Sequence, residues 1–570
     1  MNKHKIFLIL LGSIILSQGC VNLDTAPYDR ISSETFWQTP EHAKQAIMGV
    51  YGGLRRDDLY GKKYMHDNMG GLAYGWQENG YLSFMQGTAT EQTAYINNFW
   101  RTLYDEVQRA NQVIRRVPGM PVDESIKKPV VAEAKFLRAL HYADLLNYFG
   151  GVPIYDESVD LNADFNNLKK PRNTPEEVRA FIVKDLTEAI ADLPVSWPQS
   201  EYGRATKGAA YSLRGKVYLY AKNWENAIAD FEEVVYNKSN QYGYALYPKF
   251  ADIFKLAGHK SSEMIFAVQA LGGVGLDYGF PYASYIGFRG SFGGQNFGLP
   301  TVDLADSYEN KDGSVFNWND FIPGFNENKA VRQKALMATH SSGTLTSVPD
   351  TALLGQIYRG RDSRMMATLL TPYSYHLGFV ANVVRPLQFV VAVGVNENFG
   401  QCRNNSGRYT YMWRKFIPEG NENGAMSVRE HTPFNFPVIR YADVLLMLSE
   451  AYNEDNQLEK AITELNKVRA RAGMPGLNSG SAWLAVAGKA QMFERIVQER
   501  TYELAGEGHQ FSDFRRWGIA REKLDGKTIR DMFGDIILTR KFTDRDYLWP
   551  IPRTEIEMNS ALTQNPGWGN

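Results

Sequence analysis

The segment that most constrains the fold spans residues 208–237, where small and bulky residues alternate at the spacing of two packed helices. Gly215 and Ala227 lie twelve residues apart, while Tyr218 and Phe231 follow Gly215 by three and sixteen residues. Small residues let two antiparallel helices approach closely, and bulky ones fill the groove beside the crossing. The segment therefore predicts a helical hairpin.

The same spacing recurs in residues 441–473, which place Ser449, Tyr452, Ala461 and Leu465 at the corresponding positions. Such a repeat is typical of tetratricopeptide helix pairs. Two ordinary amphipathic helices can also match so loose a pattern. Both interpretations predict a mostly α protein with helix pairs as its scaffold.

Further helices are expected before the first hairpin, at about residues 40–54, 99–117, 130–149 and 175–193. Apolar residues recur there at helical spacing, and proline or glycine marks the ends. The short linkers predict antiparallel packing of neighbours. We assign residues 20–260 to an N-terminal helical scaffold and residues 436–570 to a C-terminal scaffold with an extended tail.

The stretch between the scaffolds, residues 261–435, has a different character. Residues 272–300 contain nine glycines but only two charged residues, Asp277 and Arg289. We expect no helix there, a polar loop at 341–351, and short strands at 387–395 and 408–416. Residues 261–435 are thus predicted to be a loop-rich, aromatic insertion with small β elements.

The N-terminus predicts export. Basic residues 3–5 precede an apolar run of eleven residues, Ile6 to Leu16, whereas a membrane-spanning helix needs about 20. We interpret residues 1–19 as a cleaved signal peptide and Cys20 as a lipidated N-terminus. An ordinary signal with a chance cysteine is the alternative. Cys402 is the other cysteine, so no disulfide within the lipidated chain is expected.

The charges and motifs narrow the possible functions. The chain has 62 basic and 63 acidic residues, which leaves no basic excess for nucleic acid. It contains no His-Glu-x-x-His zinc helix, no Walker phosphate loop, no Gly-x-Ser-x-Gly elbow and no Cys-x-x-Cys pair. We therefore predict no metal, no cofactor and no catalysis. A glycoside hydrolase needs only two carboxylates and stays an alternative, as does a pure protein-interaction scaffold.

A charged cluster between residues 499 and 516 could suggest acid–base chemistry. No nucleophile or phosphate loop flanks it, so we interpret it as ion pairs that fix a helix end. Its members are Glu499, Arg500, His509, Asp513, Arg515 and Arg516.

Three C-terminal segments, residues 436–453, 493–518 and 549–568, together resemble the SusD/RagB family of surface nutrient-binding lipoproteins. Segments near residues 31–54 and 134–154 are similar to this family too. The resemblance implies a tetratricopeptide-based scaffold with a loop-rich ligand face. It also implies a lipid-anchored, outward-facing outer-membrane protein that delivers oligosaccharide to a SusC-type TonB-dependent transporter. Peptide binding is the alternative within the family.

A glycan site needs flat aromatic rings for the apolar face of a sugar and amides for its hydroxyls. Two aromatic clusters fit this chemistry, one in residues 74–81 and one in residues 278–319. The alternative is that these rings have only a structural role and pack the loops onto the scaffold. The predicted ligand-binding residues are Trp76, Asn79, Tyr81, Tyr285, Asn296 and Trp318.

Overall fold

The computed structural model describes residues 36–159, 168–237, 239, 241–272, 278–342, 344–393, 400–401 and 409–569. The predicted signal peptide, Cys20 and Cys402 lie outside these ranges.

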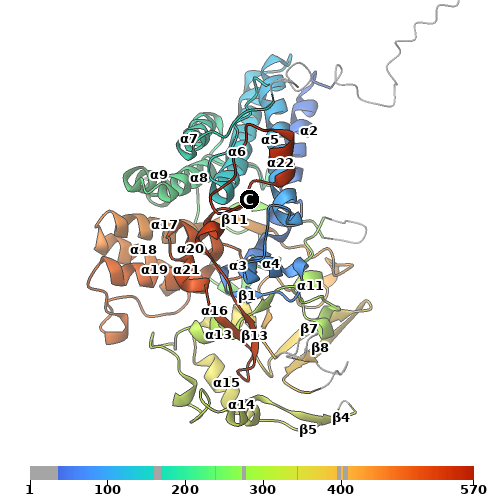
Figure 1. Cartoon of the computed structure of the whole chain (residues 1–570), viewed down its shortest axis with the longest axis vertical. Coiled ribbons are helices and arrows are strands. Elements are labelled where there is room, and N and C mark those ends of the chain that lie inside the picture. Colours follow the sequence, from blue (N-terminus) through green and yellow to red (C-terminus); the bar gives the residue numbers. More distant parts are fainter. Residues whose placement is uncertain are drawn as a thin grey trace, which may run out of the picture.

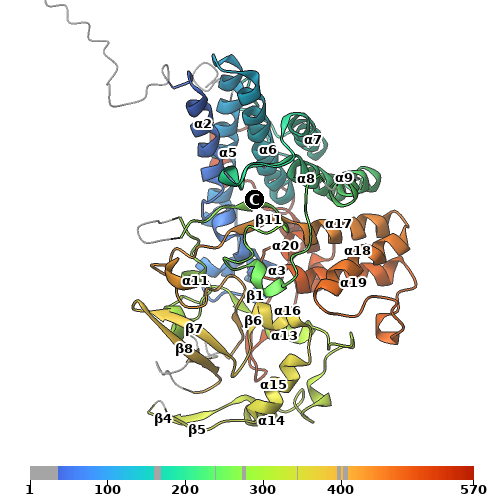
Figure 2. The same cartoon turned by 180° about the vertical axis from the view of Figure 1, so that it is seen from behind.

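Long helices from the N-terminal half form one end of the molecule (Figures 1 and 2). Thr39 caps the first of them, since its side chain accepts from the amide of His42, and Pro40 follows in the first turn. The predicted helices are confirmed, although two begin earlier than expected. These helices are α2 (Pro40–Gly53), α5 (Ala94–Arg116), α6 (Glu124–Phe149), α7 (Pro175–Asp192), α8 (Lys207–Tyr220) and α9 (Trp224–Tyr236).

Both predicted helical hairpins are present. In the first, α8 and α9 meet at Gly215, where an added Cβ would lie 2.7 Å from a ring carbon of Phe231. In the second, α17 (Tyr441–Glu454) packs on α18 (Leu458–Arg471), and the Ser449 hydroxyl donates to the Ala461 carbonyl at 2.7 Å. The mostly helical fold class is therefore confirmed, and each crossing depends on a small residue.

The remaining helices are shorter, apart from α19, and are distributed along the chain. They are α3 (His66–Gly70), α4 (Leu82–Gln86), α10 (Phe250–Ile253), α11 (Tyr282–Tyr285), α12 (Arg289–Phe292), α13 (Val302–Ser307), α14 (Lys329–Leu336), α15 (Thr351–Arg359), α16 (Ser363–Thr368), α19 (Lys489–Leu504), α20 (Gln510–Arg516), α21 (Ala520–Leu524) and α22 (Arg553–Met558). Among the described residues, every helix is too short or too polar to span a bilayer.

The strands form small separate sheets. The antiparallel pairs are β1 (Ala73–Tyr74) with β3 (Leu299–Pro300), β2 (Met264–Val268) with β11 (Phe436–Arg440), β4 (Thr339–Ser341) with β5 (Thr344–Ser347), β6 (Leu369–Leu370) with β10 (Met412–Trp413), and β12 (Thr528–Arg530) with β13 (Ile536–Thr539). In the last sheet β7 (Tyr375–Val380) pairs with β8 (Val383–Val390), which pairs in parallel with β9 (Gly400–Gln401). The β2–β11 pair joins the middle of the chain to the C-terminal scaffold.

Two predictions for the middle of the chain are wrong. Helix was excluded from residues 272–300, yet α11 and α12 lie there, because a single turn needs few bonds and glycine can end it; Gly293 does so at φ +62°. The polar loop at 341–351 instead contains the second strand of the β4–β5 hairpin. Its threonines favour strand, and Thr339 and Thr346 bond across the pair at 2.8 Å.

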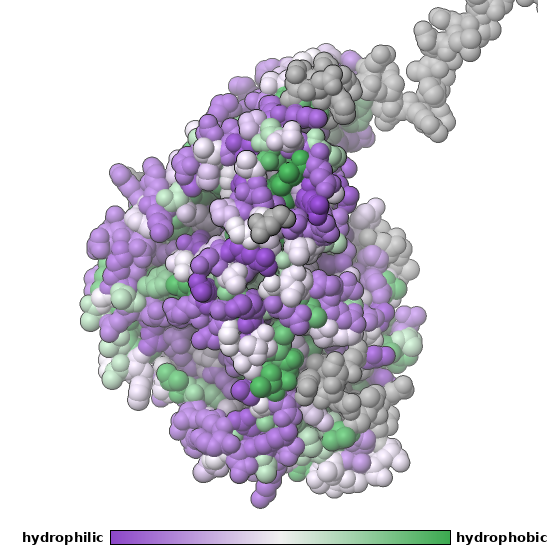
Figure 3. Space-filling view, in the orientation of Figure 1, coloured by the Kyte–Doolittle hydropathy of each residue, from purple (hydrophilic) through white to green (hydrophobic). Residues whose placement is uncertain are grey.

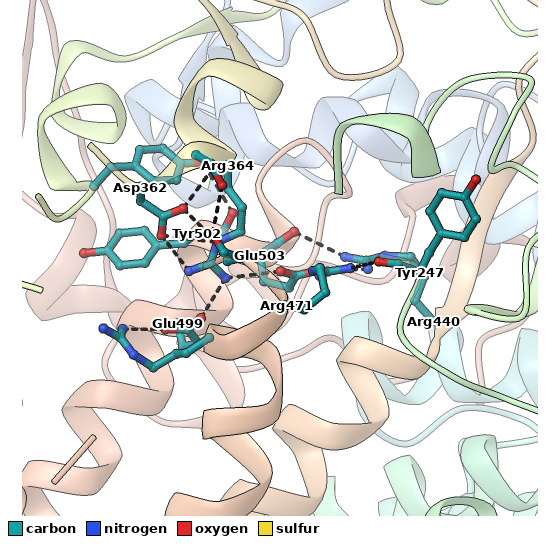
Figure 4. Close-up of polar contacts among 12 residues, drawn as sticks. Tyr247, Asp362, Arg364, Arg440, Arg471, Glu499, Tyr502 and Glu503 are labelled. Atoms are coloured by element: carbon teal, nitrogen blue, oxygen red, sulfur yellow. Dashed lines mark hydrogen bonds and ion pairs between the residues drawn. The ribbon is translucent and has the colours of Figure 1, made fainter. Parts of the chain in front are cut away.

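Buried ion pairs surround α19 (Figure 4). Glu503 accepts from Arg471 at 2.5 Å, from Arg440 at 3.0 Å and from Arg364 at 3.2 Å, and Arg364 also donates to Glu499 at 2.6 Å. All five side chains are at most 4% exposed. Charges removed from water to this extent need partners, and here the partners come from distant segments.

The charged cluster of residues 499–516 is mainly structural, as predicted. Arg500 donates to Asp443 at 2.7 Å and to Asp513 at 2.8 Å, and Arg516 donates to Asp513 at 2.8 Å. Arg515 is the exception. It donates to the carbonyl oxygens of Asn147 and Tyr547 rather than to a carboxylate.

We expect Gly215→Ala to lower the free energy of unfolding by about 1–3 kcal/mol, because the new methyl group overlaps the Phe231 ring. Gly49→Ala is the matched control, since Gly49 is exposed on α2 with no atom near its Cβ position. Alanine should stabilise that helix by about 0.5–1 kcal/mol. Urea denaturation compares the two variants, and equal effects would contradict the close helix crossing.

We expect Glu503→Gln to cost about 3–5 kcal/mol, because the arginines around it would lose a buried countercharge. Glu557→Gln is the control; this exposed residue pairs with Arg553 at 3.0 Å and should change stability by less than about 0.5 kcal/mol. Denaturant unfolding of each variant measures the difference.

Low pH should destabilise the protein by protonating Glu503. Burial alone would raise the pKa of Glu503, but Arg471, Arg440 and Arg364 lower it below its usual value. A carboxyl with a lowered folded pKa adds stability above its unfolded pKa of about 4, and this stability is lost as the pH falls further. The wild-type protein should therefore lose stability below about pH 4 more steeply than Glu503→Gln. If the stability of both proteins fell equally with pH, this role of Glu503 would be contradicted.

Candidate functional site

Two distant loops meet where β1 pairs with β3. This pairing sets Tyr74 opposite Leu299, so the residues after β1 lie against the residues before β3. Trp76 is half-buried there; its indole N–H donates to the Asn296 carbonyl at 2.9 Å, and its ring lies parallel to Phe297 with centroids 6.1 Å apart. The junction presents part of an indole ring at the surface.

A pocket of about 460 Å³ lies beside this junction. This size is in the range of small-ligand sites. The loop 78–83, the start of α5, the 3-10 turn η1 (Tyr60–Met65) and Tyr285 contribute its wall. The lining residues are Asp57, Asp58, Lys62, Glu78, Asn79, Tyr81, Ser83, Thr93, Ala94, Tyr95, Asn98 and Tyr285. Aromatic rings, amides and hydroxyls thus surround one cavity.

Lys62 holds the ring of Tyr285 in place. Its ammonium donates to the Tyr285 hydroxyl at 2.7 Å, lies 4.0 Å from the ring centroid and pairs with Asp57 at 2.5 Å. Burial alone would lower the pKa of Lys62, but the bonds to Asp57 and Tyr285 raise it. The lysine therefore stays charged and orients a half-buried ring at the pocket.

Tyr81 and Tyr95 form the inner wall, with ring centroids 4.5 Å apart. Tyr81 is buried and adopts the left-handed backbone conformation at φ 60°. His66 lies behind these rings and contacts the Tyr95 hydroxyl at 2.7 Å and the Tyr148 hydroxyl at 2.8 Å. Burial, with Lys63 nearby, keeps the pKa of His66 well below its usual value, so the imidazole is neutral.

The pocket is more acidic than basic. Asp57, Asp58 and Glu78 line it together with one cation, Lys62. Burial, reinforced by Asp57, raises the pKa of Asp58. Glu78 is held by the amide and hydroxyl of Ser83, at 2.8 and 2.9 Å. Such a lining disfavours anionic ligands.

Most of the predicted site residues converge here. Tyr81, Asn79 and Tyr285 line the pocket, and Trp76 and Asn296 form the adjoining junction. Asn296 takes part through its main-chain carbonyl, because its side chain is buried.

Trp318 lies elsewhere, which corrects its assignment. It is only 3% exposed, its N–H donates to Asp306 at 3.0 Å, and its ring stacks on Phe325 with centroids 4.3 Å apart. The alternation with Asn317 and Asn319 suggested an exposed loop. The asparagines instead cap and bridge a short turn, and Asn317 accepts from the amide of Asn319 at 3.0 Å. No sugar can stack on this ring.

The sequence analysis missed Lys62, Tyr95 and Asn98. Lys62 lies in a charged run, residues 55–63, whose pattern is typical of a solvent-exposed loop. Tyr95 and Asn98 lie three residues apart on α5, so they share a helix face, and this spacing was the available signal. Groups of three or more possible metal ligands are absent from the described part of the chain.

Comparisons with known proteins agree with this architecture. The model of the SusD family matches residues 262–568, and a model described as "Starch-binding associating with outer membrane" matches residues 22–219. A SusD-like protein of Formosa agariphila is 26% identical, with the alignment covering 96% of this chain and 95% of that protein. The starch-binding protein SusD of Bacteroides thetaiotaomicron is 28% identical over 36% of this chain and 40% of its own length.

The fold agrees as well. A crystal structure of a SusD-like protein from Bacteroides fragilis superposes with a TM-score of 0.73 at 25% identity, covering 95% of this chain and 100% of that one. The resemblance noted from three C-terminal segments thus extends over the two scaffolds and the middle of the chain. The chain belongs to the SusD family.

Proposed function

We propose that this protein binds an oligosaccharide in the pocket beside Trp76 and Tyr285. The observation that carries the proposal is the convergence of these two rings from loops more than 200 residues apart, next to the amides of Asn79 and Asn98. A sugar presents an apolar face to such rings and hydroxyls to such amides. A family described as starch-binding supports this class of ligand.

We propose a neutral glycan rather than an acidic one. The carboxylates of Asp57, Asp58 and Glu78 outnumber the single ammonium of Lys62 around the pocket, and Lys62 is already paired with Asp57. A uronic acid or a sulfate group would meet uncompensated negative charge there. Neutral hydroxyls, in contrast, can accept from amides and donate to carboxylates.

Trp76→Ala and Tyr285→Ala should each weaken binding of a neutral oligosaccharide by about tenfold, since one stacked ring contributes about 0.5–1.5 kcal/mol beyond the area that it buries. Trp483→Ala is the control, because this tryptophan is 59% exposed and lies outside the pocket. Calorimetry against neutral glycans, acidic glycans and peptides measures the affinities.

The panel also tests the ligand class. Acidic glycans should bind more weakly than neutral ones of equal length, and Asp58→Asn should narrow that difference. Binding of peptides but of no glycan would show that the ligand is a peptide. Release of reducing sugar, abolished by changing one carboxylate, would show a hydrolase instead.

We further propose that Cys20 carries a lipid that anchors the protein to the outer membrane, facing outward. The basic and apolar residues before Cys20 support export, and the family description supports association with this membrane. From there the protein would deliver its glycan to a SusC-type TonB-dependent transporter.

Mass spectrometry of the mature protein should find a lipid-modified N-terminus at Cys20, and Cys20→Ala should release the protein from the membrane fraction. Protease treatment of intact cells should remove it, which tests the outward orientation. Purification in mild detergent should recover a barrel-sized partner. Recovery of the protein alone, with its lipid present, would contradict the role in delivery.

A further inference from the structure

A second cavity, of about 400 Å³, lies within the scaffold. Residues of α6, α8, β11 and α20 line it, and η1 contributes to both cavities: Lys62 faces the pocket described above, and Lys63 lines this one. Its lining therefore belongs to the helix pairs rather than to the aromatic loops. We refer to it as the scaffold cavity.

Much of the scaffold cavity has an apolar wall. Aliphatic side chains of α6, α8 and β11 form this wall, and Leu140 and Leu213 are at most 4% exposed in the whole protein. The aliphatic wall consists mainly of Leu140, Leu213, Val217, Val438 and Ile439. A wall of this kind favours the hydrocarbon part of a ligand.

The charged residues around the scaffold cavity are mainly cationic. Two carboxylates, those of Asp144 and Glu507, also line it, but Asp144 is bonded to Lys63 at 3.5 Å, and Glu507 is bonded to Arg440 and Lys415 at 2.7 Å each. The cations that line it are Lys63, Arg179, Lys216, Arg515 and Arg516.

Two of these cations lack a carboxylate partner. Lys216 forms no hydrogen bond or ion pair with any residue that the structure describes, and Asp443 and Asp513, which act on it from a distance, are both bonded to Arg500. Arg515 donates to main-chain carbonyl oxygens and to the side-chain oxygen of Asn147. Its Nε is buried without a partner in the described chain.

Lys216 and Arg515 both line the scaffold cavity, as does the ring of Tyr220. The Lys216 ammonium is 5.7 Å from the centroid of that ring. Tyr220, Asp443 and Asp513 raise the pKa of Lys216 even though burial lowers it, so the group is charged at neutral pH. Burial lowers the pKa of Arg515 to about 10, because the charge of this group is incompletely compensated there, and a bound anion would offset that cost.

We propose that the scaffold cavity binds a small organic carboxylate with an apolar body, its carboxylate lying between Lys216 and Arg515 and its hydrocarbon part against α6, α8 and β11. Charge complementarity selects the carboxylate, and the aliphatic wall selects the body. The site is independent of the glycan pocket, because the two cavities share no lining residue.

The test is calorimetry of the purified full-length protein with decanoate, at concentrations below its micelle range, with decanol and inorganic phosphate as probes of each half of the ligand. Decanoate should bind at one site, whereas decanol and phosphate should each bind at least tenfold more weakly. Lys216→Met should weaken decanoate binding at least tenfold without lowering the melting temperature, because it removes a charge that has no partner. Lys216→Arg should retain binding.

Lys128→Met is the control, because Lys128 is an exposed lysine of α6 and receives the same substitution. It should leave decanoate binding unchanged, and both methionine variants should bind neutral glycan as the wild type does. Equal binding of decanol and decanoate, equal binding of phosphate, or an unchanged affinity in Lys216→Met would each overturn the proposal. Binding of a peptide through its C-terminal carboxylate, with no binding of decanoate, would assign the scaffold cavity to a protein partner instead.

Discussion

The buried ion pairs around α19 are the constraint on which the rest of the structure depends. Glu499 and Glu503 bind Arg364 from α16 in the middle of the chain, and Glu503 also binds Arg440 and Arg471 from the C-terminal scaffold. Glu263, beside β2, pairs with Arg471 at 2.9 Å. Removing such groups from water is costly, so each buried charge needs the partners that the other segments supply. The network therefore links α16 in the middle of the chain to α19 and to the C-terminal scaffold by charge (Figure 4).

A short series of hydrogen bonds connects these ion pairs to the pocket beside Trp76. The amide of Gly506, which follows α19, donates to Asp67 of α3 at 2.5 Å. The next residue, Asn68, donates to the carbonyls of Gly80 and Phe297, both at 3.0 Å. Gly80 belongs to the loop of Asn79 and Tyr81, and Phe297 to the loop of Tyr285. Asn68 thus joins the two loops that line the pocket. It also follows Asp67, which is bonded to Gly506 after α19.

The fold was largely predictable because its strongest signals are local. Close helix crossings need a small residue opposite a bulky one, and Gly215 with Phe231 shows this within a single hairpin. The site was predictable in part, since tyrosine and tryptophan beside amides in loops marked Trp76 and Tyr285. Trp318 carried the same local signal but is buried, because Asp306 and Phe325 cover it through tertiary packing. Lys62 and Tyr95 reach the pocket only because helices bring them there.

One face of the molecule lacks a broad apolar surface (Figure 3). The face in Figure 3 is mainly hydrophilic, and its hydrophobic residues form small separate patches.

The wall between the two cavities illustrates how rigid these sites are. Lys63 donates to the Tyr148 hydroxyl at 3.0 Å, and His66 bridges Tyr148 to Tyr95. The neutral imidazole of His66 donates from one ring nitrogen and accepts at the other, so it links the two hydroxyls in either tautomer. Tyr95 in turn donates to the Asp58 carbonyl at 3.3 Å. These bonds hold the ring of Tyr95, on which the ring of Tyr81 packs with centroids 4.5 Å apart. A preformed wall of this kind lowers the entropy that binding must overcome.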